Sequence, residues 1–161
     1  MGAASKVQKA YIAGFLDGEG SVSIQKTKIY KHRNENNPYF STVISIGQSN
    51  KTVLEWIQSM YGGSICVEKE SGRRKLPFYR WRIANRDIEK FLTDVKPYVQ
   101  LKNKHIELVL LMRAHIAKWY SFVKGRHGKD SMPKEIIEYR NNLWLQLRGL
   151  NSKGRKVNWE K

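Results

Sequence analysis

The stretch whose residue types suggest chemistry is Tyr11–Gly20, where a helical pattern runs into Glu19 held between Gly18 and Gly20. Glycine lets a chain leave a helix sharply, so we expect Glu19 at a corner between this helix and the strand that starts at Ser21. The direction of its carboxylate is then set by the end of the helix. The plainer alternative is an acidic residue that merely follows a helix end.

The helix that carries Glu19 has two different faces. One is apolar and suits a core, whereas the other is made of small or short side chains. Gly14 costs about 1 kcal/mol against alanine inside a helix, and a closely packed neighbouring helix would explain that cost. We therefore expect a helix–helix contact through the small face, which consists of Ala10, Ala13, Gly14 and Asp17.

The remaining pattern predicts the element order αββαββα, followed by helices at the C-terminal end. Two hairpins are indicated by β-branched and aromatic runs, with strands 21–30, 39–46, 64–69 and 78–83. Asn50 and Asn85 are candidate N-caps for the second and third helices, and Pro97 ends the third. A long helix follows residues 101–104, and Pro133 suits the first position of the last helix.

The predicted four-stranded antiparallel sheet has helices on one face and an open second face. Alternation assigns Val22, Ile24, Thr42, Ile44, Ile46, Trp81 and Ile83 to the core face. Twisted strands fit a DNA major groove, where arginine and glutamine can read base edges, so the open face is our candidate DNA surface. It comprises Ser23, Gln25, Thr27, Ile29, Ser41, Val43, Ser45, Arg80 and Arg82, with Lys69 at the end of the third strand.

Composition favours a polyanionic partner and an intracellular location. The chain has 161 residues, with 30 Lys+Arg against 14 Asp+Glu, and a net charge of +16. Because basic residues alternate with aromatic ones through folded-looking sequence, nucleic acid is favoured over a merely solvated basic surface or a membrane surface. We expect one domain over residues 1–161, with a core at about 5–120 and a helical, basic extension at about 121–161. One cysteine, no signal core and no long apolar run suggest a non-secreted protein of the cytoplasm or an organelle interior, without a membrane partner.

The segment Ile12-Ala-Gly-Phe-Leu-Asp-Gly-Glu-Gly20 resembles the signature of the LAGLIDADG homing endonucleases. It departs from that signature at Ile12, usually leucine, and at Glu19, more often aspartate. The resemblance implies the α+β saddle of that family, in which the motif helix packs against its twin. It also implies that the carboxylate of Glu19 and the backbone carbonyl of Gly18 hold a divalent metal, Mg²⁺, over DNA.

Three further segments are similar to the family. Lys102, within Leu101–Lys104, falls at the turn before the long helix and would lie near the metal, where a lysine offsets transition-state charge. Gln48 resembles a polar residue near the active-site water molecules. The family often has an arginine soon after, but here Thr52 follows Lys51. The basic tail resembles a segment that contacts the phosphate backbone, which assigns positioning contacts to Ser152, Lys153 and Lys156.

These features predict a catalytic trio of Glu19, Gln48 and Lys102 in a symmetric homodimer, since one Glu19 cannot cut two strands. The resemblance implies Mg²⁺-dependent cutting of a long pseudo-palindromic double-stranded DNA site, 3′ overhangs, and intron mobility. Two other classes stay open. One is an RNA maturase or a non-cleaving regulator on the same fold, and the other is a basic ribosomal or architectural protein. The four dispersed histidines and single cysteine give no zinc-ligand spacing.

Overall fold

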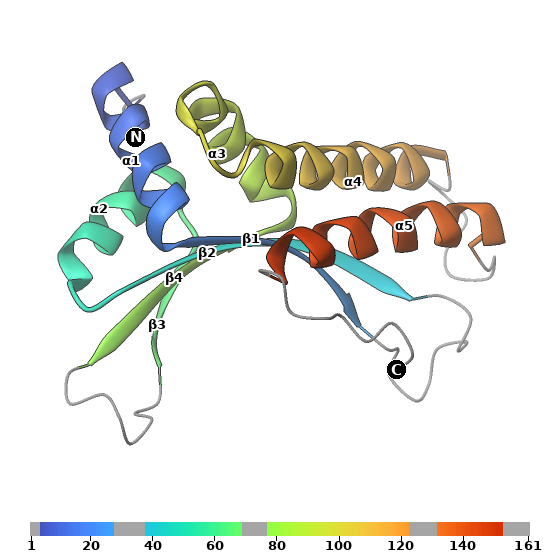
Figure 1. The fold of residues 1–161 in the computed structure, drawn as a ribbon, viewed down its shortest axis with the longest axis horizontal. Coiled ribbons are helices and arrows are strands. Elements are labelled where there is room, and N and C mark those ends of the chain that lie inside the picture. Colours follow the sequence, from blue (N-terminus) through green and yellow to red (C-terminus); the bar gives the residue numbers. More distant parts are fainter. Residues whose placement is uncertain (1–3, 28–37, 69–76, 123–131, 153–161) are drawn as a thin grey trace. The chain divides into compact units, whose positions relative to one another are not determined.

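A computed structural model describes residues 4–27, 38–68, 77–122 and 132–152 (Figure 1). Four strands form one antiparallel sheet in the order β1-β2-β4-β3. The α+β architecture and the order αββαββα are as predicted. The helices are α1 (Lys6–Glu19), α2 (Lys51–Tyr61), α3 (Ile88–Val95), α4 (Asn103–Phe122) and α5 (Lys134–Asn151), and the strands are β1 (Gly20–Thr27), β2 (Tyr39–Gln48), β3 (Ser64–Glu68) and β4 (Phe78–Ala84).

The chain groups into two compact units. The first unit takes residues 1–22 and 43–106, and the second takes residues 23–42 and 107–161. The strand β1 therefore begins in the first unit and ends in the second, whereas β2 begins in the second unit and ends in the first. A single domain over the whole chain stays a prediction.

The core of the first unit lies between its part of the sheet and the helices α2 and α3. Ile46 pairs with Trp81 across β2 and β4, and both are fully buried. The Trp81 ring lies 5.2 Å from that of Phe91 on α3, which in turn lies 5.1 Å from that of Tyr61 on α2. The helices thus cover the face that alternation predicts. In this unit the expected core-face residues are buried, namely Val22, Ile44, Ile46, Trp81 and Ile83, and in the second unit Ile24 and Thr42 are buried as well.

Helix beginnings agree with the sequence at one predicted cap and differ at the other. The side chain of Asn50 accepts a hydrogen bond from the backbone N–H of Thr52 at 2.9 Å, which is the expected N-cap of α2. Asn85, in contrast, has a φ of 56° and opens a short 3₁₀ turn, Asn85–Asp87. The helix α3 then starts at Ile88, so the expectation of Asn85 as its N-cap is wrong. A left-handed conformation is one that asparagine tolerates, and it turns the chain before the helix can begin.

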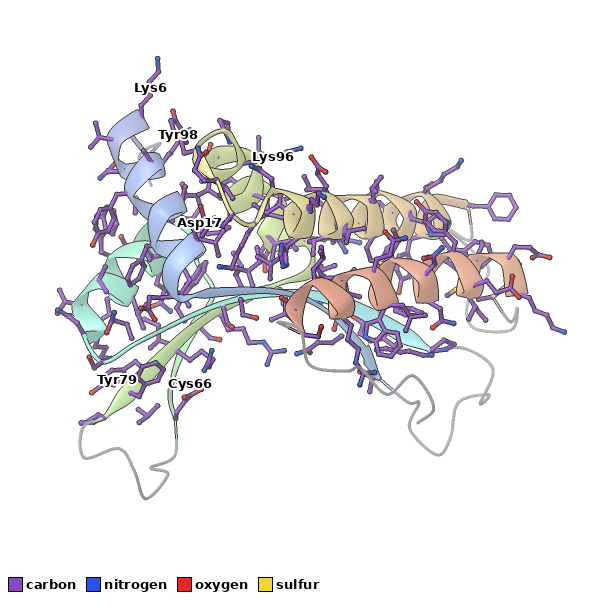
Figure 2. All side chains as sticks on the ribbon, in the orientation of Figure 1. Lys6, Asp17, Cys66, Tyr79, Lys96 and Tyr98 are labelled. Carbon is purple, nitrogen blue, oxygen red and sulfur yellow. The ribbon has the colours of Figure 1, made fainter. Side chains whose placement is uncertain are left out.

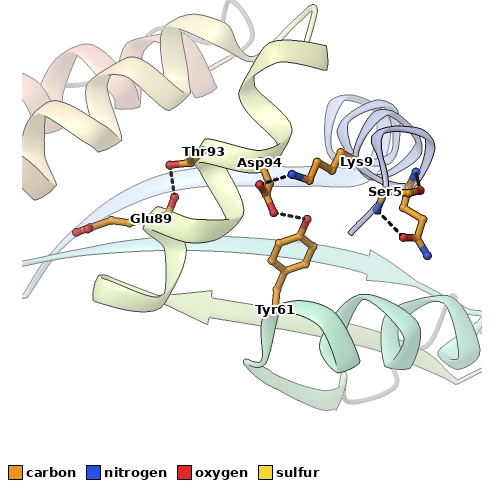
Figure 3. Close-up of polar contacts among 7 residues, drawn as sticks. Ser5, Lys9, Tyr61, Glu89, Thr93 and Asp94 are labelled. Atoms are coloured by element: carbon orange, nitrogen blue, oxygen red, sulfur yellow. Dashed lines mark hydrogen bonds and ion pairs between the residues drawn. The ribbon is translucent and has the colours of Figure 1, made fainter. Parts of the chain in front are cut away.

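Asp94 on α3 anchors α1 and α2 to the first unit (Figure 3). Its carboxylate forms an ion pair with the Nζ of Lys9 at 2.6 Å and accepts a hydrogen bond from the hydroxyl of Tyr61 at 3.2 Å. Burial, assisted by the Asp94 carboxylate, raises the pKa of Tyr61 to about 12, so this hydroxyl remains a donor at neutral pH. The position of α1, which carries Glu19, is thereby fixed relative to α3.

The second unit packs α4 and α5 around a buried arginine. Arg140 is only 3% exposed, and its Nε donates to the Nδ1 of His115 at 3.2 Å. Burial and the neighbouring Arg140 lower the pKa of His115, which favours the neutral ring that this hydrogen bond requires. Lys26 of β1 and Arg148 of α5 each lie 5.3 Å from the ring of Trp144, which is half-buried. No helix in the described part of the chain has the length and apolar character needed to cross a membrane.

Candidate active site

The end of α1 differs in detail from the corner that two glycines predict. The helix continues through Glu19, and Gly18 is an ordinary helical residue. Only Gly20 meets a close neighbour, since a Cβ there would lie 2.5 Å from the carbonyl oxygen of Leu16. Position 20 therefore requires glycine, because any side chain there would clash with the last turn of the helix. A Cβ at Gly18 would meet no described atom within 4 Å, so the fold of the described residues does not require glycine there.

Glu19 and Gly18 offer oxygen ligands of the kind that Mg²⁺ prefers. Both residues are exposed, and the last carbonyl groups of an α-helix have no helical partner. The negative end of the helix dipole also favours a cation here. Within residues 4–27, 38–68, 77–122 and 132–152, no group of three or more His, Cys, Asp or Glu side chains could hold a metal ion. The Glu19 carboxylate and the Gly18 carbonyl would make only part of a coordination shell, which would fit a metal whose other ligands come from water, DNA or a second protomer.

Asp17 joins α1 to the segment that precedes α4. Its carboxylate accepts hydrogen bonds from the backbone N–H groups of Gln100 at 2.7 Å, Leu101 at 3.2 Å and Lys102 at 3.1 Å. Figure 2 labels Asp17 in the half of α1 that leads to Glu19. Hydrogen bonds to a charged acceptor are roughly twice as strong as neutral ones, so this carboxylate holds the segment 100–102 tightly.

The same contact brings Lys102 to the end of the motif helix. Its Nζ donates to the backbone carbonyl of Asp17, two residues before Glu19. Lys102 is half-buried. Burial of His105, on the first turn of α4, lowers the pKa of its ring, and the positive charge of Lys102 lowers it further. Lys102 therefore places a positive charge at the last turn of α1, two residues before Glu19 in the chain.

Replacing Asp17 by asparagine is expected to lower the free energy of unfolding by about 1–3 kcal/mol, because the amide loses the charge and one of the two accepting oxygens. Urea denaturation followed by circular dichroism measures this loss. The cleavage rate should also fall, since the backbone that carries Lys102 loses its support. Asp87→Asn is the matched control, because Asp87 makes no side-chain cap hydrogen bond at the start of α3. Equal stabilities of the two variants would contradict the assignment.

Gln48 lies at the end of β2, as expected, and its side chain makes a local contact. The side-chain oxygen accepts hydrogen bonds from the backbone N–H of Ser49 at 2.8 Å and from its hydroxyl at 3.1 Å. This arrangement steadies the turn between β2 and α2. A part for Gln48 near the reacting phosphate stays a prediction.

The open face of the sheet carries most of the expected DNA-contacting residues. In the first unit, the register places Arg82 opposite Ser45, and Arg80 opposite Gly47 and Cys66. Val43 is only 4% exposed, so its assignment to DNA contact is wrong. It lies on β2, which has a strand on each side, whereas Ser45 on the same face of the same strand is half-buried. In the second unit Gln25 and Thr27 are exposed and Ser23 and Ser41 are half-buried, whereas Ile29 and Lys69 fall outside the described residues.

Sequence reasoning missed an acidic residue on this open face. The Nε of Arg80 donates to the Oε1 of Glu68 at 2.5 Å, and Glu68 belongs to β3. Figure 2 labels Cys66, the β3 residue directly opposite Arg80. Strand alternation puts Glu68 on the same face as Cys66, so the pattern contained this signal. Its pairing with Arg80 required the register.

A sequence pattern typical of LAGLIDADG endonucleases matches residues 12–115, which is more than half of the chain. The chain belongs to the LAGLIDADG endonuclease family. The matched range begins within the motif helix and includes both Glu19 and Lys102. The expectation of an endonuclease of this family is therefore confirmed.

Solved LAGLIDADG structures share the fold. The homing endonuclease I-CvuI, in complex with its target in the presence of calcium, has a TM-score of 0.70 at 17% identity, covering 95% of this chain and 87% of that one. The archaeal intron-encoded I-Vdi141I, complexed with DNA, has a TM-score of 0.71 at 22% identity and covers 94% and 89%. I-TnaI has a TM-score of 0.65 at 14% identity and covers 98% and 100%. No curated protein matches the sequence.

The exposed face of the LAGLIDADG helix is rotated from the expected one. Ala13 is fully buried within the protomer, because it lies beside the core residues Ile12 and Leu16, so it has no surface to offer a partner. The carboxylate of Asp17 is taken up by residues 100–102. The exposed stripe consists instead of Val7, Ala10, Gly14 and Gly18.

The residues expected to contact phosphate at the C-terminal end of this LAGLIDADG protein lie mostly outside the described part. Ser152 is half-buried, and its hydroxyl donates to the backbone carbonyl of Gly149 at 2.7 Å. The hydroxyl oxygen can still accept a hydrogen bond, but the hydroxyl proton is donated to the carbonyl of Gly149 at the end of α5. Lys153 and Lys156 fall outside the described residues.

Proposed function

We propose that this protein is a homing endonuclease that cuts both strands of a long pseudo-palindromic DNA site as a symmetric homodimer. The observation that carries the proposal is the end of α1, where Glu19 is exposed and the ammonium group of Lys102 binds the backbone carbonyl of Asp17 in the same last turn. The metal is Mg²⁺, which the oxygen ligands of Glu19 and Gly18 suit. I-CvuI, a structural neighbour, is described bound to DNA with calcium and with magnesium.

Each group at this site has a separate part. The Glu19 carboxylate and the Gly18 carbonyl would hold the cation, which would supply a lowered pKa for a water ligand and positive charge for the phosphate oxygens. Lys102 stabilises the negative charge that develops on the phosphate oxygens, and Asp17 fixes the backbone of Lys102. Gln48 orients water molecules at the end of β2. The ends produced are staggered, with 3′ overhangs.

Two exposed glycines of α1, Gly14 and Gly18, support the homodimer. A Cβ added at Gly14 or at Gly18 would meet nothing within 4 Å in the same chain. Glycine in a helix costs about 1 kcal/mol against alanine, and no contact of the described residues compensates for that cost. Close approach of a second α1 across a twofold axis does, and it brings two copies of Glu19 together for the two strands. The enzyme then works wherever its DNA lies, in the cytoplasm or in an organelle interior, and serves intron mobility.

The proposal is tested with a pool of randomised DNA duplexes incubated with the protein in Mg²⁺ or in EDTA, followed by sequencing of the ends produced. We expect recurrent staggered ends around one near-palindromic site, in Mg²⁺ only. Sedimentation of the protein on the recovered site should give two protomers per duplex.

Two outcomes would contradict the proposal in different ways. Binding that enriches a sequence without producing ends would make the protein a regulator, or a maturase if intron RNA is bound more tightly than DNA. A single protomer on each cleaved duplex would retain the endonuclease and remove the homodimer.

A further inference from the structure

The guanidinium of Arg80 is held from both neighbouring strands of the sheet. Its Nε donates to the Oε1 of Glu68 at 2.5 Å, its Nη2 forms an ion pair with the same oxygen, and its Nη1 donates to the hydroxyl of Ser45 at 3.4 Å. The side chains of Arg80 and Glu68 are 34% and 29% exposed. Arg80 is thus oriented before any ligand arrives, although its tip still reaches solvent.

Gly47 on β2 makes room for this arrangement. It stands opposite Arg80 in the register, and a Cβ there would lie 2.6 Å from the ring of Phe78 and 3.7 Å from the Cζ of Arg80. A real side chain would displace the Phe78 ring, which lies on the same face. The absence of a side chain at position 47 lets the ring and the guanidinium lie close to the strand.

The contacts leave one particular part of the guanidinium for a ligand. Arginine has five N–H donors in a planar fork. Glu68 takes the edge made by Nε and Nη2, and Ser45 takes one N–H of Nη1. One N–H on each Nη is therefore left for a ligand. In the major groove, guanine presents two adjacent acceptors, O6 and N7, and an arginine tip that donates to both is the commonest specific contact.

We propose that Glu68 is a specificity-determining positioning residue, which presets Arg80 to read one guanine in each half of the DNA site. This inference rests on the proposed function. The negative charge of Glu68 has a second effect, because it offsets the attraction between Arg80 and a phosphate. The pair therefore favours a base edge, where two hydrogen bonds are directional, over the phosphate backbone, where charge alone decides.

The test is a selection of binding sites from randomised duplexes in EDTA, where no hydrolysis occurs. The unaltered protein should prefer guanine at one position per half-site by about 10- to 100-fold, and Arg80→Gln should abolish that preference. Glu68→Gln should reduce it to less than about 5-fold and should steepen the slope of log affinity against log salt by up to about one. Glu68→Ala, which removes the acceptor as well as the charge, should act in the same direction and further.

Glu89→Gln is the matched control, because Glu89 lies on α3, the helix that covers the opposite face of the sheet. It should leave both the preference and the salt slope unchanged, and thermal melting checks that every variant is folded. An undiminished guanine preference in Glu68→Gln, with an unchanged salt slope, would reduce Glu68 to a structural residue. A guanine preference that survives Arg80→Gln would also overturn the inference. If the unaltered protein enriches no sequence, the site-specific function itself fails, before any variant is compared.

Discussion

Glu19→Gln protein is expected to bind its DNA site as tightly as the unaltered protein and to cut it at least about 10³-fold more slowly. A metal ion contributes several kcal/mol of charge stabilisation in the transition state, and each 1.36 kcal/mol is a factor of ten in rate. The amide of glutamine has nearly the same shape as the carboxylate but carries no charge. Glu19 is exposed, so its replacement leaves the core of the first unit untouched.

Single-turnover cleavage of the selected site measures the rate, and a filter-binding titration measures the affinity. Glu89→Gln serves again as control, because it removes one negative charge from an exposed helix position of the same unit. Retained cutting by Glu19→Gln would refute the metal assignment. A parallel loss of binding and cutting would show instead that Glu19 supports the fold or the DNA surface.

Gly14→Ala should have opposite effects on the protomer and on the dimer. Within the chain the added methyl group meets nothing within 4 Å, so helix propensity should stabilise the isolated protomer by up to about 1 kcal/mol. At a close helix contact the same methyl group overpacks, typically at a cost of about 1–3 kcal/mol, and the twofold axis applies the cost twice. The dissociation constant of the dimer should therefore rise about 30- to 10⁴-fold, and cleavage at low protein concentration should fall with it.

Gly149→Ala is a close control for this substitution. Gly149 is also a helical glycine, on α5, where a Cβ would meet nothing within 4 Å. It should stabilise the fold by a similar amount and leave the dimer intact, as measured by analytical ultracentrifugation over a concentration series. If Gly14→Ala and Gly149→Ala dimerise equally well, the interface lies on another face of the protomer.

The parts of the fold that local patterns determine were predictable. Strand alternation places Ile44 and Ile46 on one face whatever the partner strand is, and both are fully buried. The side chain of Asn50 needs only the next turn of chain to act as a cap. The carboxylate of Glu19 was located by its own glycine-flanked motif, and the match over residues 12–115 confirms the family that the motif indicates.

The parts that failed depend on contacts that no local pattern contains. Ala13 is small, and smallness alone does not decide whether a residue faces a partner or the protomer's own core. Val43 alternates onto the open face, as expected, and is nevertheless buried, which alternation alone does not predict. Asp17 binds Gln100 across 83 positions of sequence, and Arg80 finds Glu68 across 12. Such pairs become visible only when the register and the loop path are known.

The strands β1 and β2 each run from one compact unit into the other, and this division has an evolutionary consequence. Gln25 and Thr27 belong to the second unit, while Arg80 and Arg82 share the first unit with Glu19. Substitutions around Gln25 therefore affect the packing of the second unit, whereas Glu19 belongs to the first unit. Under the proposed function, a lineage that meets an altered target could change part of its recognition by drift in the second unit without changing the residues proposed for cleavage.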